Sequence, residues 1–250
     1  DVYNGTTKIK SKELGRGEKR MHVYSIRMKL YVMEEMRLNE VQQHLIAFLD
    51  HGLSKMEGFV EWHSDNRYKY YCFDYLYPIE RDGVYKKNQV YTLTIRTVDP
   101  KLAEYLANQV VHTYTKKLKG LTSEVRILPK KIIEVLYTLT PAILKCDTGY
   151  WQQEMTAEKY EERMKINLIK KWNALTGEKM DEEFSLFTGV EFLSKCPVAT
   201  EYKGIKLLGD KIRLHIADNK SAQSLAYMAL GTGILEMNAR GFGFVNYRWI

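Results

Sequence analysis

A glycine-rich stretch near the C-terminal end carries the strongest local signal for chemistry in the sequence. Residues 231–245 read GTGILEMNARGFGFV. Glycine lets a backbone come close to a phosphate and leaves amide donors accessible, and an arginine beside it adds charge. No Lys-Ser or Lys-Thr pair follows, so the stretch is neither a Walker loop nor a dinucleotide-binding fingerprint. It is either a phosphate-binding loop or a bulged hairpin that needs glycine for its geometry, and spacing alone favours the hairpin.

Metal-binding and redox patterns are missing from the sequence. The six histidines are scattered, and neither an HxxxH pair nor an Asp/Glu cluster accompanies them. We therefore expect neither a metal nor another cofactor. Cys72, Cys146 and Cys196 are widely separated without a CxxC pair, which is typical of reduced thiols in a cytoplasmic protein.

The composition favours a globular protein with a polyanionic partner. Lysine and arginine outnumber aspartate and glutamate by 38 to 31, which gives a formal net charge of +7. The 18 tyrosines could stack on nucleic-acid bases, although core packing accounts for them equally well. No apolar run reaches the length of about 18 residues that a membrane span needs. Residues 1–20 are polar and lack the apolar segment of a signal peptide, so we expect a polar extension there, either native or added in cloning.

The elements that must position these residues follow from the hydrophobic periodicity. Residues 21–148 predict the order β-α-β-β-α-β, which is the ferredoxin-like unit, with two helices on one face of the sheet and the other face free. Asn39 is the expected cap of the first helix, and Asp99-Pro100 starts the second. The strands are expected at 22–33, 68–75 and 89–98, and the last one at either 123–128 or 132–138.

The second half, residues 149–250, shows a similar order with additions. A helix capped by Thr156 ends near Gly177, strands follow near 185–193, 198–207 and 210–217, and Asn219 or Ser221 opens another helix before a last strand at 242–249. We therefore expect an α+β protein made of two tandem ferredoxin-like units, with a C-terminal Gly-rich loop and a domain boundary near residues 146–154.

Three motifs in consistent order resemble one family. Gly-x-Gly followed by Asn-x-x-Gly-Phe-Gly and a closing strand resembles the signature loop of the repeat-associated mysterious protein (RAMP) superfamily, the double ferredoxin-like proteins of CRISPR systems. Seven residues separate Gly233 from Gly241, which makes this loop slightly longer than the family pattern. YTLTPAIL at 137–144 and WHSDNRYKYYCFDYL at 62–76 are similar to segments of the pre-crRNA-processing endoribonucleases in that superfamily. The resemblance extends over residues 21–250.

The resemblance implies an RNA-binding endonuclease of CRISPR antiviral defence, a nuclease and hydrolase that cleaves precursor RNA within its repeats without a metal. It implies His63 as the catalytic histidine and Lys69, six residues later, as its partner. The chemistry is consistent, because RNA supplies its own 2′-OH nucleophile and needs only a base, an acid and positive charge on the phosphorane. The products would be a 2′,3′-cyclic phosphate and a 5′-OH. Without the resemblance, His63 would be read as an exposed loop histidine.

The tyrosine that the family often carries on its first helix is absent, since Leu45-Ile46-Ala47 stands in its place. His44 and His51 are seven residues apart, within about 20° of each other on a helix. One of them, preferably His51, could supply the missing acid, or both are ordinary rim residues. Tyr68 and Tyr70 are weaker candidates for the same role.

RNA contact is expected from basic residues and from the Gly-rich loop. An alternative interpretation is a non-catalytic RAMP subunit that binds guide or repeat RNA in a CRISPR effector complex and does not need His63. An unrelated small-molecule enzyme is disfavoured by the missing Asp/Glu/His cluster. The sequence predicts no oligomeric state. The residues expected to contact RNA are Arg240, Gly231, Gly233, Gly241, Gly243, Asn238, Lys130, Lys131, Arg96 and Lys145.

Overall fold

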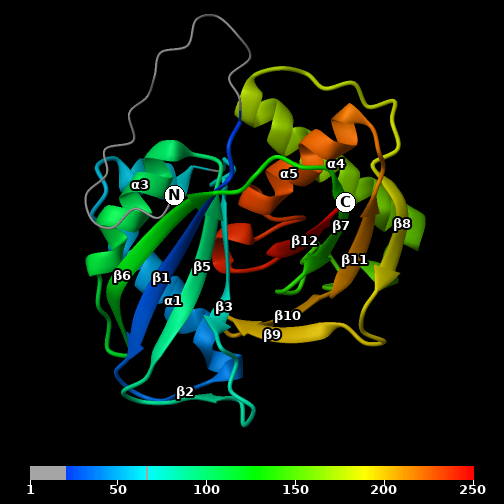
Figure 1. Ribbon diagram of the computed structural model, residues 1–250. Helices are drawn as coiled ribbons and strands as arrows, with labels where there is room; N and C mark the ends of the chain where they lie inside the picture. Colours follow the sequence, from blue (N-terminus) through cyan, green and yellow to red (C-terminus); the bar gives the residue numbers. More distant parts are fainter. Residues whose placement is uncertain (1–20, 66) are drawn as a thin grey trace, which may run out of the picture.

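The computed structural model describes residues 21–65 and 67–250, so the extension expected at residues 1–20 lies outside the described residues. Two four-stranded sheets lie next to each other, each with antiparallel strand pairs and its own hydrophobic core (Figure 1). None of the described helices is both long and apolar enough to cross a membrane.

The first unit is ferredoxin-like, with the strand order β3-β5-β1-β6. Residues alternate along β1, so that Ile26, Met28 and Leu30 enter the core between the sheet and two helices. Asp99 caps α3 through its carboxylate, with Pro100 in the first turn, as the sequence predicts. The elements are β1 (Tyr24–Val32), α1 (Leu38–Leu53), β3 (Tyr71–Tyr77), β5 (Val90–Thr97), α3 (Pro100–Asn108), the 3₁₀ turn η1 (Val110–His112) and β6 (Leu118–Ile127).

Two details of the first unit differ from the prediction. Helix α1 begins at Leu38 with Arg37 as its N-cap, not at the expected cap Asn39, and the Glu40 carboxylate accepts the Arg37 amide at 3.3 Å. A short helix, α2 (Phe59–Ser64), follows α1 and was not predicted, because its six residues are all at least partly exposed and show no apolar face. A small two-stranded sheet joins β2 (Met36–Arg37) to β4 (Val84–Tyr85).

The second unit repeats the ferredoxin-like order as β12-β7-β11-β8. Thr156 caps its first helix and Gly177 ends it in a left-handed conformation, and Asn219 rather than Ser221 caps the second helix. The elements are β7 (Ile133–Thr138), η2 (Trp151–Gln153), α4 (Ala157–Thr176), β8 (Phe187–Phe192), β9 (Val198–Tyr202), β10 (Ile205–Gly209), β11 (Ile212–Ile216), α5 (Lys220–Thr232), η3 (Asn238–Arg240) and β12 (Val245–Trp249).

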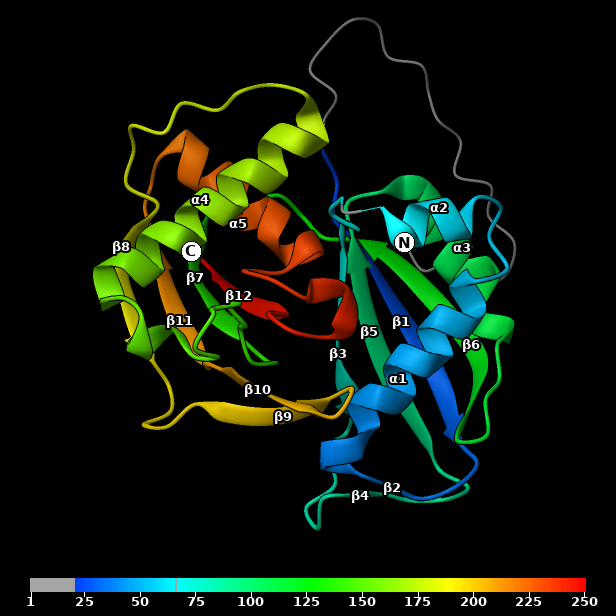
Figure 2. The ribbon, with the colours of Figure 1, turned by 180° about the vertical axis from the view of Figure 1, so that it is seen from behind.

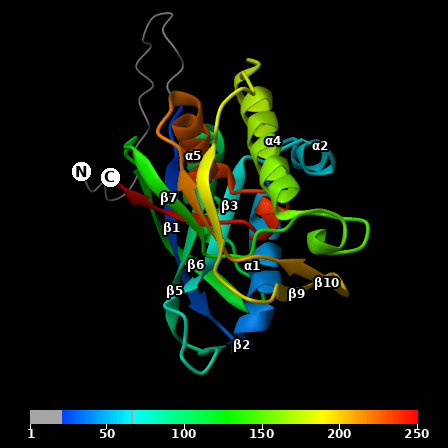
Figure 3. The ribbon, with the colours of Figure 1, turned by 90° about the vertical axis from the view of Figure 1, so that its right-hand side faces the viewer.

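The β9–β10 hairpin is an addition to the second unit that reaches the first one. The Gln43 Nε2 on α1 donates to the Glu201 carbonyl on β9 at 3.3 Å. Figure 3 shows α1, α2 and this hairpin on the side of the molecule opposite the C-terminal end of the chain. The hairpin therefore links the two units on the side that carries α2.

The two candidate strands at the end of the first unit belong to different sheets. Strand β6 pairs with β1 in the first sheet, whereas β7 pairs with β11 and β12 in the second. The chain therefore passes from one sheet to the other within residues 128–132, ahead of the expected division between residues 148 and 149. Both strands have strand-like patterns, so only tertiary pairing separates them.

The second unit covers part of the sheet face that was expected to be free. Helix α5 packs between the two sheets, and a Cβ on its Gly231 would lie 2.8 Å from Val98 Cγ1. On the same face, the Arg96 guanidinium donates to the Val245 carbonyl at 2.7 Å. The two ferredoxin-like units are thus joined along β3 and β5, next to the Gly-rich loop.

Candidate active site

The Gly-rich loop is built around the Asn238 side chain. Its amide nitrogen donates to the Ile234 carbonyl at 2.8 Å and to the Phe242 carbonyl at 3.0 Å, which closes the loop on itself. The buried ammonium of Lys171, on α4, donates to Asn238 Oδ1 at 2.7 Å and to the Gly233 and Leu235 carbonyls at 3.0 and 2.9 Å. Burial lowers the pKa of Lys171 to about 7. One side chain from a neighbouring helix therefore fixes the loop from inside.

The four glycines of the loop serve this packing. Gly233 and Gly243 have φ values of 71° and 64°, and a Cβ at either position would come within 2.5 Å or less of Asn238 Nδ2 or the Ile234 carbonyl oxygen. Their amides donate within the protein, to the Ala229 and Pro141 carbonyls. Gly241 presses against Phe73 in the same way, and Gly231 lies within α5. Gly231, Gly233, Gly241, Gly243 and Asn238 are therefore buried parts of the framework, and their contact with RNA stays a prediction.

Arg240 extends from this loop to helices α1 and α2 of the first unit. Its Nη1 forms an ion pair with Asp50 Oδ2 on α1 at 2.6 Å, and its Nη2 lies 3.4 Å from His63 Nε2 on α2. Gln42 Nε2, two turns before Asp50 on α1, donates to the Arg240 carbonyl at 2.7 Å. Burial alone would lower the pKa of Arg240, but the Asp50 carboxylate outweighs it and raises that pKa. The structure thus brings His63 and Arg240 together over 177 residues of sequence.

His63 is held on α2 by aromatic packing. Its ring stacks on Phe59 with centroids 5.0 Å apart, and the neighbouring Trp62 stacks on Tyr71 at 6.3 Å. The buried Tyr71 hydroxyl donates to the Ala239 carbonyl at 3.3 Å, one residue before Arg240. Helix α2 is therefore connected to the Gly-rich loop through side chains on β3 as well as through Arg240.

Lys69 joins the same cluster from the segment after α2. Its ammonium donates to the Trp62 carbonyl and, at 2.8 Å, to the Asp65 carbonyl, and it lies 4.9 Å from the centroid of the Trp62 ring. Burial lowers the pKa of Lys69, and the neighbouring positive charges act in the same direction. These bonds use two of the three ammonium hydrogens, and the cation lies at the end of the helix that carries His63.

The two histidines proposed as the acid lie differently. His44 is half-buried near Glu34 and Lys117, and burial together with Lys117 lowers its pKa. It is two residues from Gln42, so it points to the far side of α1 from the Arg240 contact. His51 is exposed in the last turn of α1, and no hydrogen bond or ring contact joins it to His63 among the described residues. The structure therefore separates His44 from the cluster.

Of the remaining basic candidates, Arg96 is buried and the three lysines are exposed. Arg96 is 7% exposed and donates to the Val245 carbonyl on β12, so it joins the two sheets. It is therefore not available for the RNA contact that the sequence predicted. Lys130 and Lys131 are exposed in the connection between the sheets, which crosses near the viewer in Figure 1, while α1 lies behind the first sheet. Lys145 is exposed beside the Gly-rich loop, and its amide donates to Glu236 Oε2 at 3.1 Å.

Sequence reasoning missed Asp50, Gln42 and Lys171. Gln42 and Asp50 are eight residues apart, which puts them on one side of α1 next to its apolar stripe. Lys171 follows Leu168 by three residues, so it lies on the buried side of α4. A polar residue at a core position is the signal that could have identified them. No group of three His, Cys, Asp or Glu side chains within residues 21–65 and 67–250 could hold a metal ion.

Comparisons with known proteins agree with the double ferredoxin-like fold. Residues 127–247 match the family model described as CRISPR associated protein Cas6, C-terminal. A solved structure described as CRISPR associated protein Cas6 is 18% identical with a TM-score of 0.64, and the match covers 90% of this chain and 99% of that chain. No curated protein matches the chain.

Two further structures extend the likeness. One is described as an RAMP protein binding different RNA substrates, at 16% identity and a TM-score of 0.65, covering 90% of this chain and 99% of the other. Another is the product of a Cas6-related gene from Pyrococcus furiosus, at 14% identity and a TM-score of 0.62, covering 90% and 98%. At such identities the structures establish the fold, and the family match covers the Gly-rich loop. Residues 127–247 therefore belong to the C-terminal family of CRISPR associated protein Cas6, and the chain as a whole has the fold of the solved Cas6 and RAMP structures.

Proposed function

We propose that the chain is an endoribonuclease that cleaves CRISPR precursor RNA within its repeats and needs no metal ion. The observation that carries the proposal is that Arg240, from the Gly-rich loop, approaches both His63 and Lys69, which lie six residues apart in and after α2. Transesterification by a 2′-OH requires a base, an acid and positive charge on the phosphorane, and these three residues offer the base and the charge. Repeat RNA is the substrate that the family membership favours.

His63 takes the proton from the 2′-OH beside the scissile phosphate. Its ring is exposed at the end of α2, so a bound strand can reach it. A histidine titrates near neutral pH, and a positioned acid or base contributes a rate factor of about 10² to 10⁴. The products are a 2′,3′-cyclic phosphate and a 5′-OH.

Arg240 and Lys69 stabilise the charge that develops on the phosphorane. Arg240 Nη2 already lies 3.4 Å from His63 Nε2, so a phosphate that approaches the imidazole also approaches the guanidinium. Lys69 keeps one ammonium hydrogen that the described residues do not use. His51 is the proposed acid for the leaving 5′-oxygen, because it is exposed in the last turn of α1, the end of that helix from which the chain continues into α2.

The test is a cleavage assay on end-labelled repeat RNA with EDTA present. We expect cutting at one position, a cyclic phosphate on the upstream product, and no cutting when the nucleotide at that position lacks its 2′-OH. The deoxy substrate should still bind. Cleavage of the deoxy substrate would contradict the 2′-OH mechanism, and a requirement for a divalent cation would contradict metal independence.

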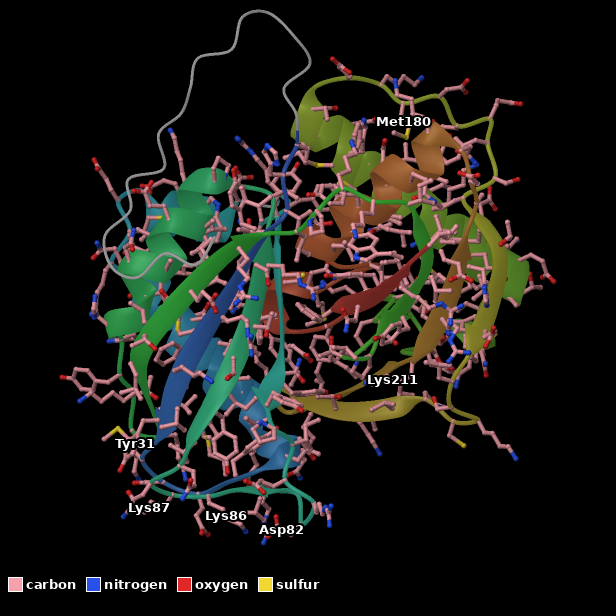
Figure 4. All side chains as sticks on the ribbon, in the orientation of Figure 1. Tyr31, Asp82, Lys86, Lys87, Met180 and Lys211 are labelled. Carbon is pink, nitrogen blue, oxygen red and sulfur yellow. The ribbon has the colours of Figure 1, made fainter. Side chains whose placement is uncertain are left out.

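The position of Lys69 allows a matched control for charge. Lys69→Ala should slow cleavage and weaken binding modestly, because a cation on the phosphate helps both the ground state and the transition state. Lys87→Ala is the control, because it removes an exposed lysine at the lower end of the first unit, where Asp82 and Tyr31 are also labelled (Figure 4). Helix α2 lies near the other end of that unit (Figure 2). Equal effects of the two variants would show that only net charge matters.

A second candidate is a non-catalytic RAMP subunit that holds repeat or guide RNA in a CRISPR effector complex. Ala47 favours it, because the family's helix-one tyrosine is missing at that position. Tight binding of repeat RNA without any cleavage would support this candidate.

A further inference from the structure

A cavity of about 370 Å³ lies between the segment after α2 and the Gly-rich loop. Figure 2 shows this loop, in red, next to β3. Its volume is at the lower end of the range of about 300 to 1,000 Å³ for small-molecule sites, which suits one nucleotide better than a duplex. Its lining includes Tyr68, Lys69, Tyr70, Lys145, Asn167 and Glu236.

The charges around the cavity favour an anionic ligand. Four basic side chains line it, against the single carboxylate of Glu236. Lys69 belongs both to this lining and to the His63 cluster, because its ammonium is bonded to the carbonyl of Trp62, the residue before His63. Residues 235–239 line the cavity, and the next residue, Arg240, reaches His63. The cavity therefore lies beside the position that the scissile phosphate would occupy.

Aromatic rings form part of its wall. The half-buried rings of Tyr68 and Tyr70 have centroids 6.1 Å apart at 48°. Burial raises the pKa of both phenols, so their hydroxyls stay neutral donors at physiological pH. Base stacking on such rings is tolerant of sequence and contributes about 1 to 3 kcal/mol per base.

Backbone strain concentrates at the same cavity. Five described residues other than glycine have positive φ, and Tyr70, Leu235 and Met237 are three of them, at 53°, 54° and 59°. All three line the cavity. Conformations of this kind cluster at ligand sites, where the surrounding structure enforces them.

Two oxygen acceptors of the lining are available to a ligand. Asn167 Oδ1 is buried and has no hydrogen-bond partner among the described residues. Glu236 Oε2 accepts the Lys145 amide, and no partner is found for Oε1 in the described chain. An unpaired buried acceptor is costly until a donor reaches it. Exocyclic amines of adenine, cytosine and guanine are such donors, whereas uracil has no exocyclic amine and donates only through N3–H.

We propose that this cavity is a subsite for one unpaired nucleotide next to the scissile phosphate, and that it selects a base with an exocyclic amine. The base stacks on Tyr68 and Tyr70, its amine donates to Glu236 and Asn167, and the ammonium groups of Lys69 and Lys145 donate to oxygens of the flanking phosphates. The identification of the ligand as RNA rests on the function proposed above. Glu236 is a specificity residue in this arrangement and takes no part in proton transfer.

The test combines base deletion in the RNA with substitution in the protein. Repeat RNAs carry an abasic site at each nucleotide around the cut in turn, and a 2′-deoxy nucleotide at the cut keeps them intact for affinity measurements. We expect one abasic position next to the cut to weaken binding by about 5- to 150-fold, which corresponds to 1 to 3 kcal/mol of stacking. Tyr68→Ala should bind the intact RNA more weakly by the same factor. Its affinity should no longer change when that abasic site is introduced. Tyr114→Ala, at a tyrosine that is 68% exposed outside the cavity, is the matched control.

Base exchange at the same nucleotide tests the selection. Uracil should weaken binding to the wild type several-fold, and Glu236→Gln should reduce the difference between the amine-bearing base and uracil. If no abasic position affects binding, or if the affinity of Tyr68→Ala still changes with the abasic site, the proposed subsite is wrong. The proposed nuclease function is not affected by that outcome, because cleavage does not require the subsite. Binding that responds to the abasic site, together with no cleavage of the corresponding repeat RNA that keeps its 2′-OH at the cut, would keep the subsite and reject the nuclease. Urea unfolding of Tyr68→Ala checks that the variant is folded.

Discussion

The Gly-rich loop and helix α2 meet at Arg240 and His63, but they are built in opposite ways. In the loop, residues 231–235 and 241–245 are all buried, and Lys171 and Asn238 bind its carbonyls from inside. In α2, no residue is buried, and six residues are too few for a helix to be stable alone. One region is a framework that depends on packing. The other carries the exposed histidine and depends on the framework for its position.

This difference shows that the most conspicuous motif in the sequence does not have to be the one that carries the chemistry. The glycines are the most conspicuous residues of the C-terminal region, and they make room for Asn238. His63 lies in a short polar stretch, and its position is set by Phe59, Arg240 and the Trp62–Tyr71 stack. We therefore expect substitutions in the loop to affect stability first, and substitutions around α2 to affect the rate of cleavage first.

The largest effect is expected at His63. His63→Ala should lower the single-turnover cleavage rate by about 10² to 10⁴ and leave the affinity for repeat RNA nearly unchanged, because the phosphate and base contacts lie elsewhere. His112→Ala, at an exposed histidine in η1, should have no effect. If His63→Ala is fully active, His63 is not the general base, and His51 becomes the candidate for that role. The reaction would then not depend on a residue of α2.

The next effect is expected inside the loop. Lys171→Met should lower the free energy of unfolding by about 3 kcal/mol, because Asn238 Oδ1 and two carbonyls lose a charged donor in a buried site. Urea denaturation measures this change, and Lys170→Met, at the exposed neighbouring residue, is the control. Unchanged stability would show that the loop does not depend on its buried ammonium.

The architecture could be predicted from the sequence because its periodicities are local. The β-α-β-β-α-β order, the caps at Asp99, Thr156 and Asn219 and the stop at Gly177 depend on residues close in the chain. The pairing of β7 with the second sheet depends on contacts more than 70 residues apart, and a pattern read along the chain does not contain it.

The candidate site was predicted only in part for the same reason. His63 and Lys69 were identified through a family resemblance and Arg240 through the glycines around it, and Arg240 approaches both of the others in the structure. Asp50 was missed because a carboxylate on an amphipathic helix is ordinary until its partner is known. Arg96 was misassigned because a basic residue on a strand gives no sign that a second sheet will cover it.

A smaller effect is expected at Asp50, which acts through Arg240. Asp50→Asn should slow cleavage about tenfold, equivalent to about 1.4 kcal/mol, because the guanidinium loses the carboxylate that holds it near His63. Binding should stay the same or tighten, since the freed cation can approach phosphate. Arg240→Ala should instead weaken binding and reduce its salt dependence by roughly one contact.

The rate and the dissociation constant, measured for both single variants and the double variant, separate positioning from direct contact. If Asp50 acts only by holding Arg240, Asp50→Asn should add nothing to Arg240→Ala. Additive losses would assign Asp50 a role of its own.

The last prediction concerns how the contribution of Lys171 to the free energy of unfolding depends on pH. Burial lowers the pKa of Lys171 to about 7, against about 10.4 in an unfolded chain. Between these values the unfolded chain binds more protons, so the contribution of this residue to the free energy of unfolding rises with pH. It is complete above about pH 10.4 and is lost as the pH falls to about 7. Burial raises the pKa of Cys72, the nearby thiol, to about 12, and because the wild type and the Lys171 variant both contain this thiol, its contribution cancels in their difference.

The measurement is the difference in unfolding free energy between the wild type and Lys171→Met in urea at pH 7, 8 and 9. The hydrogen bonds that methionine cannot replace add a constant to this difference, and the titration adds a slope, so we expect the difference to grow with pH. The cleavage rate needs a separate pH profile, because His63 lies outside the framework. A difference that stays flat would mean that Lys171 remains charged in the fold, and that three acceptors within 3.0 Å stabilise the ammonium more than burial destabilises it.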